Sequence, residues 1–469
     1  MYRRRRSVSW TDNLDGVVMA ITDFLRETGF GNIPETVTRQ SRLWFLDLVG
    51  VAAAGSRTPL SGLIRDHACA HFAAGGRGAR ILFDGRTVSP PGAALAGGMT
   101  IDALDAHDGH RLTKGHAGCG ALPAVLAYMD AEDIADGREL LIGLILGYEI
   151  GTRAGIALHR LARDYHTSGA WVAVAAAAIG VRLLGLGGPA ARHAIGIGEY
   201  HGPRSPMMRC IDHPTMVKDG SGWGAMAGVS AAYLAQDGFT GAPATLVDSP
   251  DTADLWRDLG QRWRILEQYY KPFPVCRWAQ PAIEAALALK AAHGIAADDI
   301  ARIEVESFDE AVRLATRRPQ TTEEAQYSLP FPVAAATVRG RLGIDEVAGD
   351  VLGDPGIRRL SETMALTADP ALSARFPERR VARVRFLLRN GSILSSGDTE
   401  AFGDPERPAT ADRIRDKFET YAEPVLSAGR TRTIARTIEA IGTDTSGHEP
   451  ILGQLLASPP DGLSERLPR

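Results

Sequence analysis

The segment from Asp105 to His116 gathers two aspartates, three histidines, an arginine and a lysine in one short stretch. An unperturbed histidine has a pKa of about 6.5, so it can give or take a proton near neutral pH. A carboxylate that orients an imidazole is a common arrangement for moving a proton during catalysis. The residue types of this segment therefore predict general acid–base chemistry.

Two other interpretations of this segment stay open. Mixed nitrogen and oxygen ligands suit zinc, manganese or iron, and Asp105, His107, His110 and His116 could supply them. The spacing matches no His-Glu-x-x-His helix, Cys-x-x-Cys pair or calcium-binding loop, which are the specific metal signatures. The segment could also be a polar surface loop whose histidines are incidental.

Glycines at positions 109, 115, 118 and 120 interrupt this region, which lies between two apolar helical stretches. We therefore expect a loop carried on a rigid scaffold, where catalytic residues tend to lie. Helical periodicity runs from about residue 14 to 265, with helices expected to begin near Pro34, Arg138 and Ser168. Ser168 is the expected cap of an alanine-rich helix that ends near Leu184. Small residues from Gly224 to Ala232 should let neighbouring helices approach closely.

The pattern changes after the aromatic and proline residues at 269–274, which mark a domain crossing. Alternating strands are expected at 301–308 and 381–388, and Asn390-Gly391 predicts a hairpin to the next strand. Helices are expected at 280–293, 332–340, 357–366 and 411–442. These elements predict a small α+β domain after the all-helical one.

The whole chain has an ordinary composition for a globular protein, with 469 residues, 45% hydrophobic and 23% charged. The net charge of -4 argues against a nucleic-acid partner, which would need a basic surface. The longest apolar run, 171–181, is too short for a membrane span, and the basic run Arg3 to Arg6 precedes no signal-like apolar core.

The 4 cysteines, at positions 69, 119, 210 and 276, have no Cys-x-x-Cys spacing. This spacing gives no support for an iron–sulfur cluster, a zinc knuckle or a disulfide framework, and a reduced cytoplasmic protein is expected. Cys119 and Cys276 are possible nucleophiles, but free cysteine is more often a small buried hydrophobe.

A second polar cluster runs from Tyr200 to Gly224 and contains Arg204, Arg209, His213 and Lys218. Cationic side chains before a glycine-rich helix start are suited to an anion, and arginine pairs with carboxylates in a bidentate manner. The lysine is not preceded by Gly-x-x-x-x-Gly, so a Walker-type phosphate loop is excluded. With Lys271 and Arg277 at the domain crossing, these cations favour a small polycarboxylate ligand.

Several motifs occur in an order and spacing that resemble one known family, the MmgE/PrpD family. It includes 2-methylcitrate dehydratase, cis-aconitate decarboxylase and iminodisuccinate epimerase. The motifs are residues 42–52, 104–116, 147–153, 165–169, 216–218, 238–241, 271–277 and 325–330.

The resemblance implies a mainly α fold with a large all-helical domain and a smaller α+β lid with an antiparallel sheet. The helical domain would comprise residues 1–268 and 411–469, and the lid 269–410. A homodimer, an active site between the two domains and the absence of a metal or organic cofactor are also implied. The shared chemistry removes a proton α to a carboxylate of a small di- or tricarboxylic acid, followed by elimination, decarboxylation or reprotonation.

The family's motifs also imply roles for individual residues. His116 would be the base or acid, oriented by Asp105 or Asp108, and Lys218 the opposing acid, base or electrophile; His166 is a further candidate. From their charge and position in the sequence, we expect Arg204, Arg209, Lys271 and Arg277 to hold the substrate carboxylates, and Tyr165 or Tyr327 to donate a hydrogen bond.

The chain departs from the family after two of these residues. Ala117-Gly118 follows His116 where other members have Pro-Ser, and Asp219 follows Lys218 where they have Pro and a nearby His. We therefore expect a divergent lyase or isomerase with its own substrate, in which the stretch 201–213 brings Arg204 and Arg209 into the pocket. The alternatives are a binding or scaffold homologue that has lost turnover and a metal-dependent hydrolase.

Overall fold

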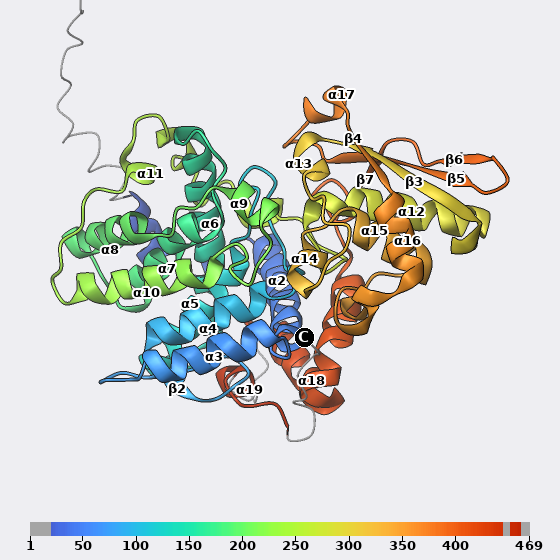
Figure 1. The fold of residues 1–469 in the computed structure, drawn as a ribbon. Coiled ribbons are helices and arrows are strands. Elements are labelled where there is room, and N and C mark those ends of the chain that lie inside the picture. Colours follow the sequence, from blue (N-terminus) through green and yellow to red (C-terminus); the bar gives the residue numbers. More distant parts are fainter. Residues whose placement is uncertain (1–19, 444–450, 461–469) are drawn as a thin grey trace, which may run out of the picture.

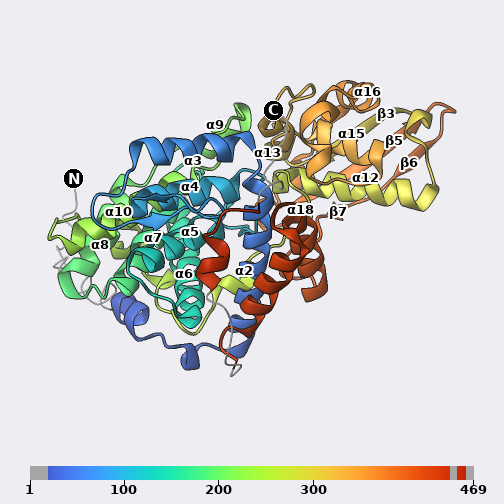
Figure 2. The ribbon, with the colours of Figure 1, turned by 90° about the horizontal axis from the view of Figure 1, so that it is seen from below.

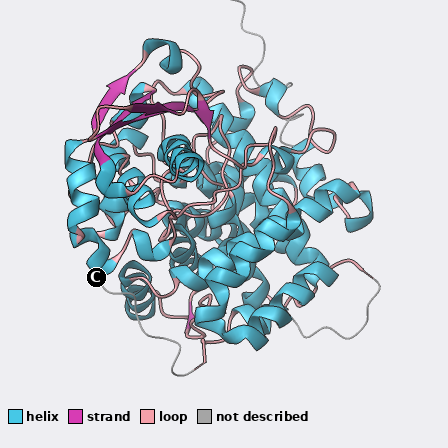
Figure 3. Cartoon of the chain, turned by 90° about the vertical axis from the view of Figure 1, so that its right-hand side faces the viewer, coloured by secondary structure: helices cyan, strands magenta, loops and turns pink. Residues whose placement is uncertain are grey.

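The structure is a computed structural model that describes residues 20–443 and 451–460. Helices dominate it, and the strands of the larger sheet lie at one end of the molecule (Figures 1 and 3). The prediction of a mainly α protein is confirmed. The basic run Arg3 to Arg6 and the outer ends of the expected helical domain lie outside the described residues.

The first half of the chain forms a bundle in which α7 contacts α5, α6, α8 and α10. Its helices are α2 (Glu35–Gly55), α3 (Pro59–His71), α4 (Pro90–Asp102), α5 (Gly118–Ala131), α6 (Gly137–Leu161), α7 (Gly169–Leu183), α8 (Gly188–His201), α9 (Met207–Asp212), α10 (Ser221–Gln236) and α11 (Thr245–Asp248). The helices expected to begin near Pro34, Arg138 and Ser168 correspond to α2, α6 and α7.

Small residues let α10 lie directly against α7. A Cβ atom added to Gly228 would lie 2.3 Å from the carbonyl oxygen of Ala173, and one added to Gly224 would lie 2.3 Å from that of Gly169. Any side chain at these positions would therefore push the two backbones apart. The expectation of closely approaching helices in this region is confirmed.

This half is not purely helical, contrary to expectation. Strands β1 (Ala79–Arg80) and β2 (Thr87–Val88) form a small antiparallel pair, closed by a turn in which Gly85 has a φ of +82°. The backbone N–H of Arg80 donates to the Asp130 carboxylate at 2.7 Å, which fixes this pair against α5. Such short strands leave too weak a pattern to be found in the sequence.

Helix α18 (Ala411–Ala440) returns to the first half of the chain and packs against α2 (Figure 2). It bends at Ser427, where φ is +70°, three residues after Pro424, which cannot donate a helical hydrogen bond. The short helix α19 (Ile451–Leu455) packs against α18. The helix expected at 411–442 is therefore confirmed.

The other part of the chain, between α11 and α18, surrounds a five-stranded sheet with the order β4-β3-β5-β6, in which β7 also pairs with β5. Its elements are α12 (Gln280–His293), β3 (Ile300–Ser307), α13 (Asp309–Val312), α14 (Thr322–Gln326), α15 (Pro330–Arg339), α16 (Pro355–Thr363), β4 (Ala365–Ala368), α17 (Pro370–Ser373), β5 (Val381–Leu388), β6 (Ile393–Ser395) and β7 (Thr399–Glu400). The hairpin expected at Asn390-Gly391 joins β5 to β6, with Gly391 at a φ of +87°.

The sheet is mixed, whereas the sequence predicted an antiparallel one. Strand β4 pairs with β3 in parallel, and it occupies residues that were expected to continue the helix at 357–366. The helix stops at Thr363 because the Arg317 guanidinium binds the carbonyl oxygens of Ser361, Glu362 and Met364. Satisfying these carbonyls from another segment ends the helix without further turns.

The buried apolar side chains form two large clusters. One joins the bundle helices with α18 and α19, and the other fills the space around the sheet. Met207 and Ile211 of α9 belong to the second cluster, although α9 comes from the first half of the chain. Helix α9 therefore ties the bundle to the α+β part next to the loop that carries His116.

Helix α6 is long and apolar enough to cross a membrane, but 94% of its most apolar window is buried inside the protein. Burial on all sides by neighbouring helices accounts for its composition.

Candidate active site

The loop between α4 and α5 carries the histidines and aspartates singled out in the sequence. The side chains of its aspartates and histidines are buried; His107 and Asp108 are 0% exposed and His116 is 7% exposed. Burying so many ionisable groups is costly unless they are paired. The aspartates and histidines of this loop are therefore enclosed by the protein and do not face solvent.

His116 is held by backbone and not by a carboxylate. Its Nδ1 lies 2.6 Å from the carbonyl oxygen of Asp108, so Nδ1 carries the proton and donates it to that oxygen. Burial, followed by electrostatic repulsion from His107 and Lys271, lowers the pKa of His116 to about 3. The ring is thus neutral near pH 7, and the lone pair of Nε2 is free to accept a proton.

Asp105 and Asp219 face this free nitrogen. The Nε2 atom of His116 lies 3.8 Å from Oδ1 of Asp105 and 3.9 Å from Oδ2 of Asp219. Asp105 adopts a φ of +49° and pairs with the Lys271 ammonium at 2.7 Å. Burial acts to raise the pKa of Asp105, but the charges of Lys271 and Lys218 outweigh it and hold that pKa below its usual value.

Asp219 has the opposite electrostatics. Burial, followed by the negative charge of Asp102, raises the pKa of Asp219 to about 7. Ser168 donates to Oδ2 of Asp219 at 2.7 Å and accepts the backbone N–H of His116 at 3.0 Å. Ser168 therefore links the two residues, and it makes no capping hydrogen bond to α7, contrary to expectation.

Asp108 contributes its backbone, because its carboxylate turns away from His116. Oδ2 of Asp108 accepts a hydrogen bond from the Tyr148 hydroxyl at 2.5 Å, and burial raises the pKa of Asp108 to about 6. The candidate role of orienting His116 thus falls to the Asp108 carbonyl oxygen. A sequence pattern cannot distinguish a carbonyl partner from a carboxylate partner.

Lys218 is fully enclosed next to Asp219, with a φ of +53°. Its ammonium donates to the Gln326 side chain and lies 4.7 Å from the centre of the Tyr327 ring. Gln326 in turn donates to the carbonyl oxygen of Ala103 at 3.2 Å. Lys218 therefore joins the bundle to α14 and places a positive charge behind Tyr327.

Arg277 is buried beside the site, and its donors are already engaged. Its guanidinium binds the carbonyl oxygens of Tyr270 and Phe402 and pairs with Asp404 at 3.0 Å. It also lies 4.8 Å from the centre of the Tyr269 ring. Its contacts tie the chain around Tyr270 to the segment before α18.

The remaining sequence candidates lie away from His116. Arg204 pairs with Glu199 at 2.9 Å and is largely exposed, and Arg209 is exposed on α9. The Nδ1–H of His166 donates to the carbonyl oxygen of Asp164 at 2.9 Å. Tyr165 is half-buried against Lys114 and Phe376. The structure therefore does not bring Arg204 and Arg209 into the pocket, contrary to expectation.

A narrow cavity of about 20 Å³ lies where these groups converge. Asp105, His116 and Asp219 line it from the bundle side, and Tyr269, Trp278 and Tyr327 line it from the other side. Lys114 also lines it. A space of this size holds about one water molecule.

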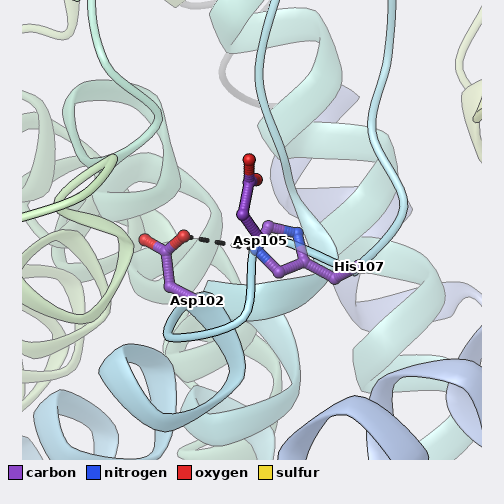
Figure 4. Close-up of side chains that lie close together, drawn as sticks. All are labelled: Asp102, Asp105 and His107. Atoms are coloured by element: carbon purple, nitrogen blue, oxygen red, sulfur yellow. Dashed lines mark hydrogen bonds and ion pairs between the residues drawn. The ribbon is translucent and has the colours of Figure 1, made fainter. Parts of the chain in front are cut away.

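A possible cation site lies behind the cavity. Asp102, Asp105 and His107 bring one ligand atom each within 4.8 Å of one another, as Figure 4 shows. His107 already bonds to Asp102 at 3.3 Å, and the Lys271 ammonium occupies one side of Asp105. His110 pairs with Glu267 at 3.2 Å and, like His116, does not join this group within the described residues. The ligand set expected for a metal-dependent hydrolase is therefore not assembled.

Comparison with known proteins matches almost the whole chain to the family that its sequence motifs resemble. The family models for the MmgE/PrpD N-terminal domain and the MmgE/PrpD C-terminal domain match residues 19–254 and 273–442. A cis-aconitate decarboxylase-like protein, oryM, of Aspergillus oryzae is 23% identical, with 92% of this chain and 96% of that protein covered. Cis-aconitate decarboxylase of Mus musculus is 20% identical, with 91% of each chain covered.

Proposed function

Since the chain belongs to the MmgE/PrpD family, we propose that it is a lyase or isomerase acting on a small di- or tricarboxylic acid. The reaction begins with removal of a proton from the carbon next to a carboxylate, without a metal or organic cofactor. Dehydration, decarboxylation and epimerisation all follow from this step. The low identity to both cis-aconitate decarboxylase relatives supports a divergent member with its own substrate.

The observation that carries this proposal is the neutral His116 ring, with its free Nε2 in the cavity between two carboxylates. Nε2 takes the α-proton, and the electron pair of the broken C–H bond spreads into the adjacent carboxylate. The resulting imidazolium is stabilised by Asp105, whose pKa is held low so that it stays ionised. The Asp108 carbonyl oxygen keeps the ring in the correct orientation throughout.

The developing negative charge on the substrate needs positive charge nearby, since stabilising a charge that grows in the transition state speeds the reaction. Lys271 lies 2.7 Å from Asp105, and Lys218 lies behind Tyr327. Both are enclosed, so their charge acts through a medium that screens it weakly.

Asp219 is the proposed proton donor for the second half of the reaction. The surroundings of the two carboxyl groups move their pKa values apart, which is the pattern that separates an ionised group from a protonated one in many active sites. A protonated Asp219 can give its proton to the carbanion or to a departing hydroxyl group. The family motif suggests Lys218 as the proton donor. In this proposal the role of Lys218 is instead to stabilise negative charge on the substrate.

We also propose a homodimer in the cytoplasm. The family implies the dimer, and three apolar side chains close in sequence to the buried Lys218 are exposed to solvent: Met216, Val217 and Trp223. The 4 cysteines are free, which suits a reducing compartment.

Proton NMR in D2O tests the proposed function directly. The purified protein is incubated with succinate, malate, citrate, cis-aconitate and aspartate, and loss of the signal at the carbon next to a carboxylate is followed. Exchange that His116→Gln abolishes, and that the exposed control His293→Gln leaves unchanged, supports the assignment. Exchange that persists in folded His116→Gln refutes His116 as the base. If the wild-type protein exchanges no acid of the panel, the proposed enzymatic activity is contradicted and a binding homologue is favoured.

A further inference from the structure

Two cationic side chains, one that lines the cavity and one that lies against a ring of its lining, have no carboxylate in an ion pair with them. Lys114 lines the cavity, and Arg380 lies immediately before β5. The guanidinium carbon of Arg380 is 5.0 Å from the centre of the Tyr269 ring, which also lines the cavity. Neither Lys114 nor Arg380 forms an ion pair with any residue that the structure describes.

Arg380 is the more unusual of the two. It is only 4% exposed, and its single hydrogen bond runs from Nη2 to the carbonyl oxygen of Arg111 at 3.2 Å. Its Nε and Nη1 atoms have no partner in the described part of the chain. A buried guanidinium normally satisfies its donors, because leaving them unpaired costs free energy. These two donors are therefore available to a ligand.

Lys114 adds a second positive charge in the same place. Its ammonium lies 3.9 Å from the centre of the Tyr165 ring, a neighbour that stabilises a cation but neutralises no charge. Burial, followed by the charge of Arg380, lowers the pKa of Lys114 to about 8. An anion between the two side chains would relieve this repulsion.

Tyr269 fixes the position of this pair relative to His116. The rings of His116 and Tyr269 meet edge to face with their centres 6.4 Å apart, and the Arg380 guanidinium lies against the same tyrosine. The other arginine against Tyr269, Arg277, has its donors engaged by Asp404 and backbone carbonyls. Arg380 thus offers free guanidinium donors one aromatic ring away from the imidazole.

We propose that Arg380 and Lys114 form the subsite for a second carboxylate of the substrate, one that takes no part in the proton transfer. This inference rests on the proposed function, and it narrows the substrate class to acids with carboxylates at opposite ends of a short carbon chain. Arg380 takes the carboxylate through a charge-assisted hydrogen bond from Nε or from Nη1, the two unpartnered donors, which lie on different edges of the guanidinium. The subsite replaces the role expected for Arg204 and Arg209, which lie on the surface.

Binding of matched acids tests the subsite without requiring turnover. Succinate and butyrate have the same chain length and differ in one carboxylate, and their affinities are measured by titration calorimetry. We expect the wild-type protein to prefer succinate and Arg380→Met to lose about tenfold or more of that preference, as for a lost charge-assisted hydrogen bond. Affinity for butyrate should change little.

Arg379→Met is the matched control, since it removes the same charge from the neighbouring residue. Arg379 is exposed and pairs with Glu400 at 2.7 Å, so its variant should keep the preference for succinate. Lys114→Met provides a second variant, with a smaller loss expected, should Arg380→Met fail to fold. A folded Arg380→Met protein with the full wild-type preference, or a wild-type protein without any preference, would overturn the subsite.

The same variants separate this inference from the proposed function. If His116→Gln abolishes proton exchange while Arg380→Met binds succinate normally, the subsite alone is wrong. If succinate binding depends on Arg380 but no acid in the panel exchanges its proton, the subsite stands and the proposed reaction fails.

Discussion

The Nε2 atom of His116 and the Oδ2 atom of Asp219 lie 3.9 Å apart, and Ser168 hydrogen-bonds to both residues. At this distance a single substrate atom beside the two groups can lie within hydrogen-bond reach of both the imidazole and the carboxyl group. Ser168 comes from the start of α7 and Asp219 from the turn before α10, so two adjacent helices set the spacing. The close contact of α7 and α10 is thereby connected to the geometry of the site.

Asp219→Asn should change how the reaction depends on pH. If Asp219 donates a proton, the wild-type rate is highest while the group is protonated and falls as pH rises through about 7, the raised pKa of this residue. The neutral asparagine cannot titrate or donate, so the variant should be slower by about a hundredfold and lack this inflection. Rates of turnover between pH 5 and 9 make the measurement. A variant with the wild-type inflection would show that another group titrates there.

Lys271→Met should destabilise the protein strongly, because it leaves the buried Asp105 carboxylate without its partner. Removing one member of a buried ion pair costs about 3–5 kcal/mol of unfolding free energy, measurable by urea denaturation. The double variant Asp105→Asn with Lys271→Met removes both charges and should recover most of that stability while staying inactive. Equal stability of the single and double variants would contradict the pairing.

Gly228→Ala should weaken the contact between α7 and α10. The new Cβ would lie 2.3 Å from the Ala173 carbonyl oxygen, and such overpacking typically costs about 1–3 kcal/mol. Gly429→Ala in α18 is the control, since nothing lies within 4 Å of its Cβ position and alanine favours a helix. Thermal unfolding should show the first variant melting lower and the second melting no lower than the wild type. The reverse order would refute this account of the helix contact.

The proposed homodimer makes a prediction about the apolar surface around Lys218. Val217 is 66% exposed and Trp223 is 41% exposed, and covering them in a dimer would remove apolar surface from water. Light scattering after size-exclusion chromatography should give a dimer for the wild type and a monomer for the double variant Val217→Asp with Trp223→Asp. Ile393→Asp, at another exposed position in β6, should remain a dimer. A monomeric wild type would contradict the proposal.

Local sequence patterns were sufficient for most of the helices and for the hairpin. The helix expected at 280–293 has those limits in the structure, and Gly391 turns the chain between β5 and β6. These elements depend on periodicity and on turn residues, which act over a few positions. Strand β4 was missed, because its first residues were expected to belong to the helix at 357–366. Contacts with distant segments, from Arg317 at the end of α16 and from β3 along β4, decide its structure.

The site was predicted less completely, because its contacts join residues far apart in the sequence. The loop at 105–116 and the lysines at 218 and 271 stand out by residue type and motif. Arg204 also stands out by residue type, but it forms an ion pair with Glu199, five residues earlier. Asp219 and Arg380 were missed, since an acid beside a lysine and one of two consecutive arginines look like surface residues until burial is known.

The cavity beside His116 holds about 20 Å³, far less than the roughly 150 Å³ of a cavity that admits benzene. We therefore expect the acid of the proposed reaction to enter only when the side chains around the cavity move aside, and to react after they close around it. Inside the closed space the proton on His116 has little water to exchange with. A substrate deuterated at the reacting carbon should then return part of its label to the same molecule, so that isotope lost to solvent reports how often the protein opens.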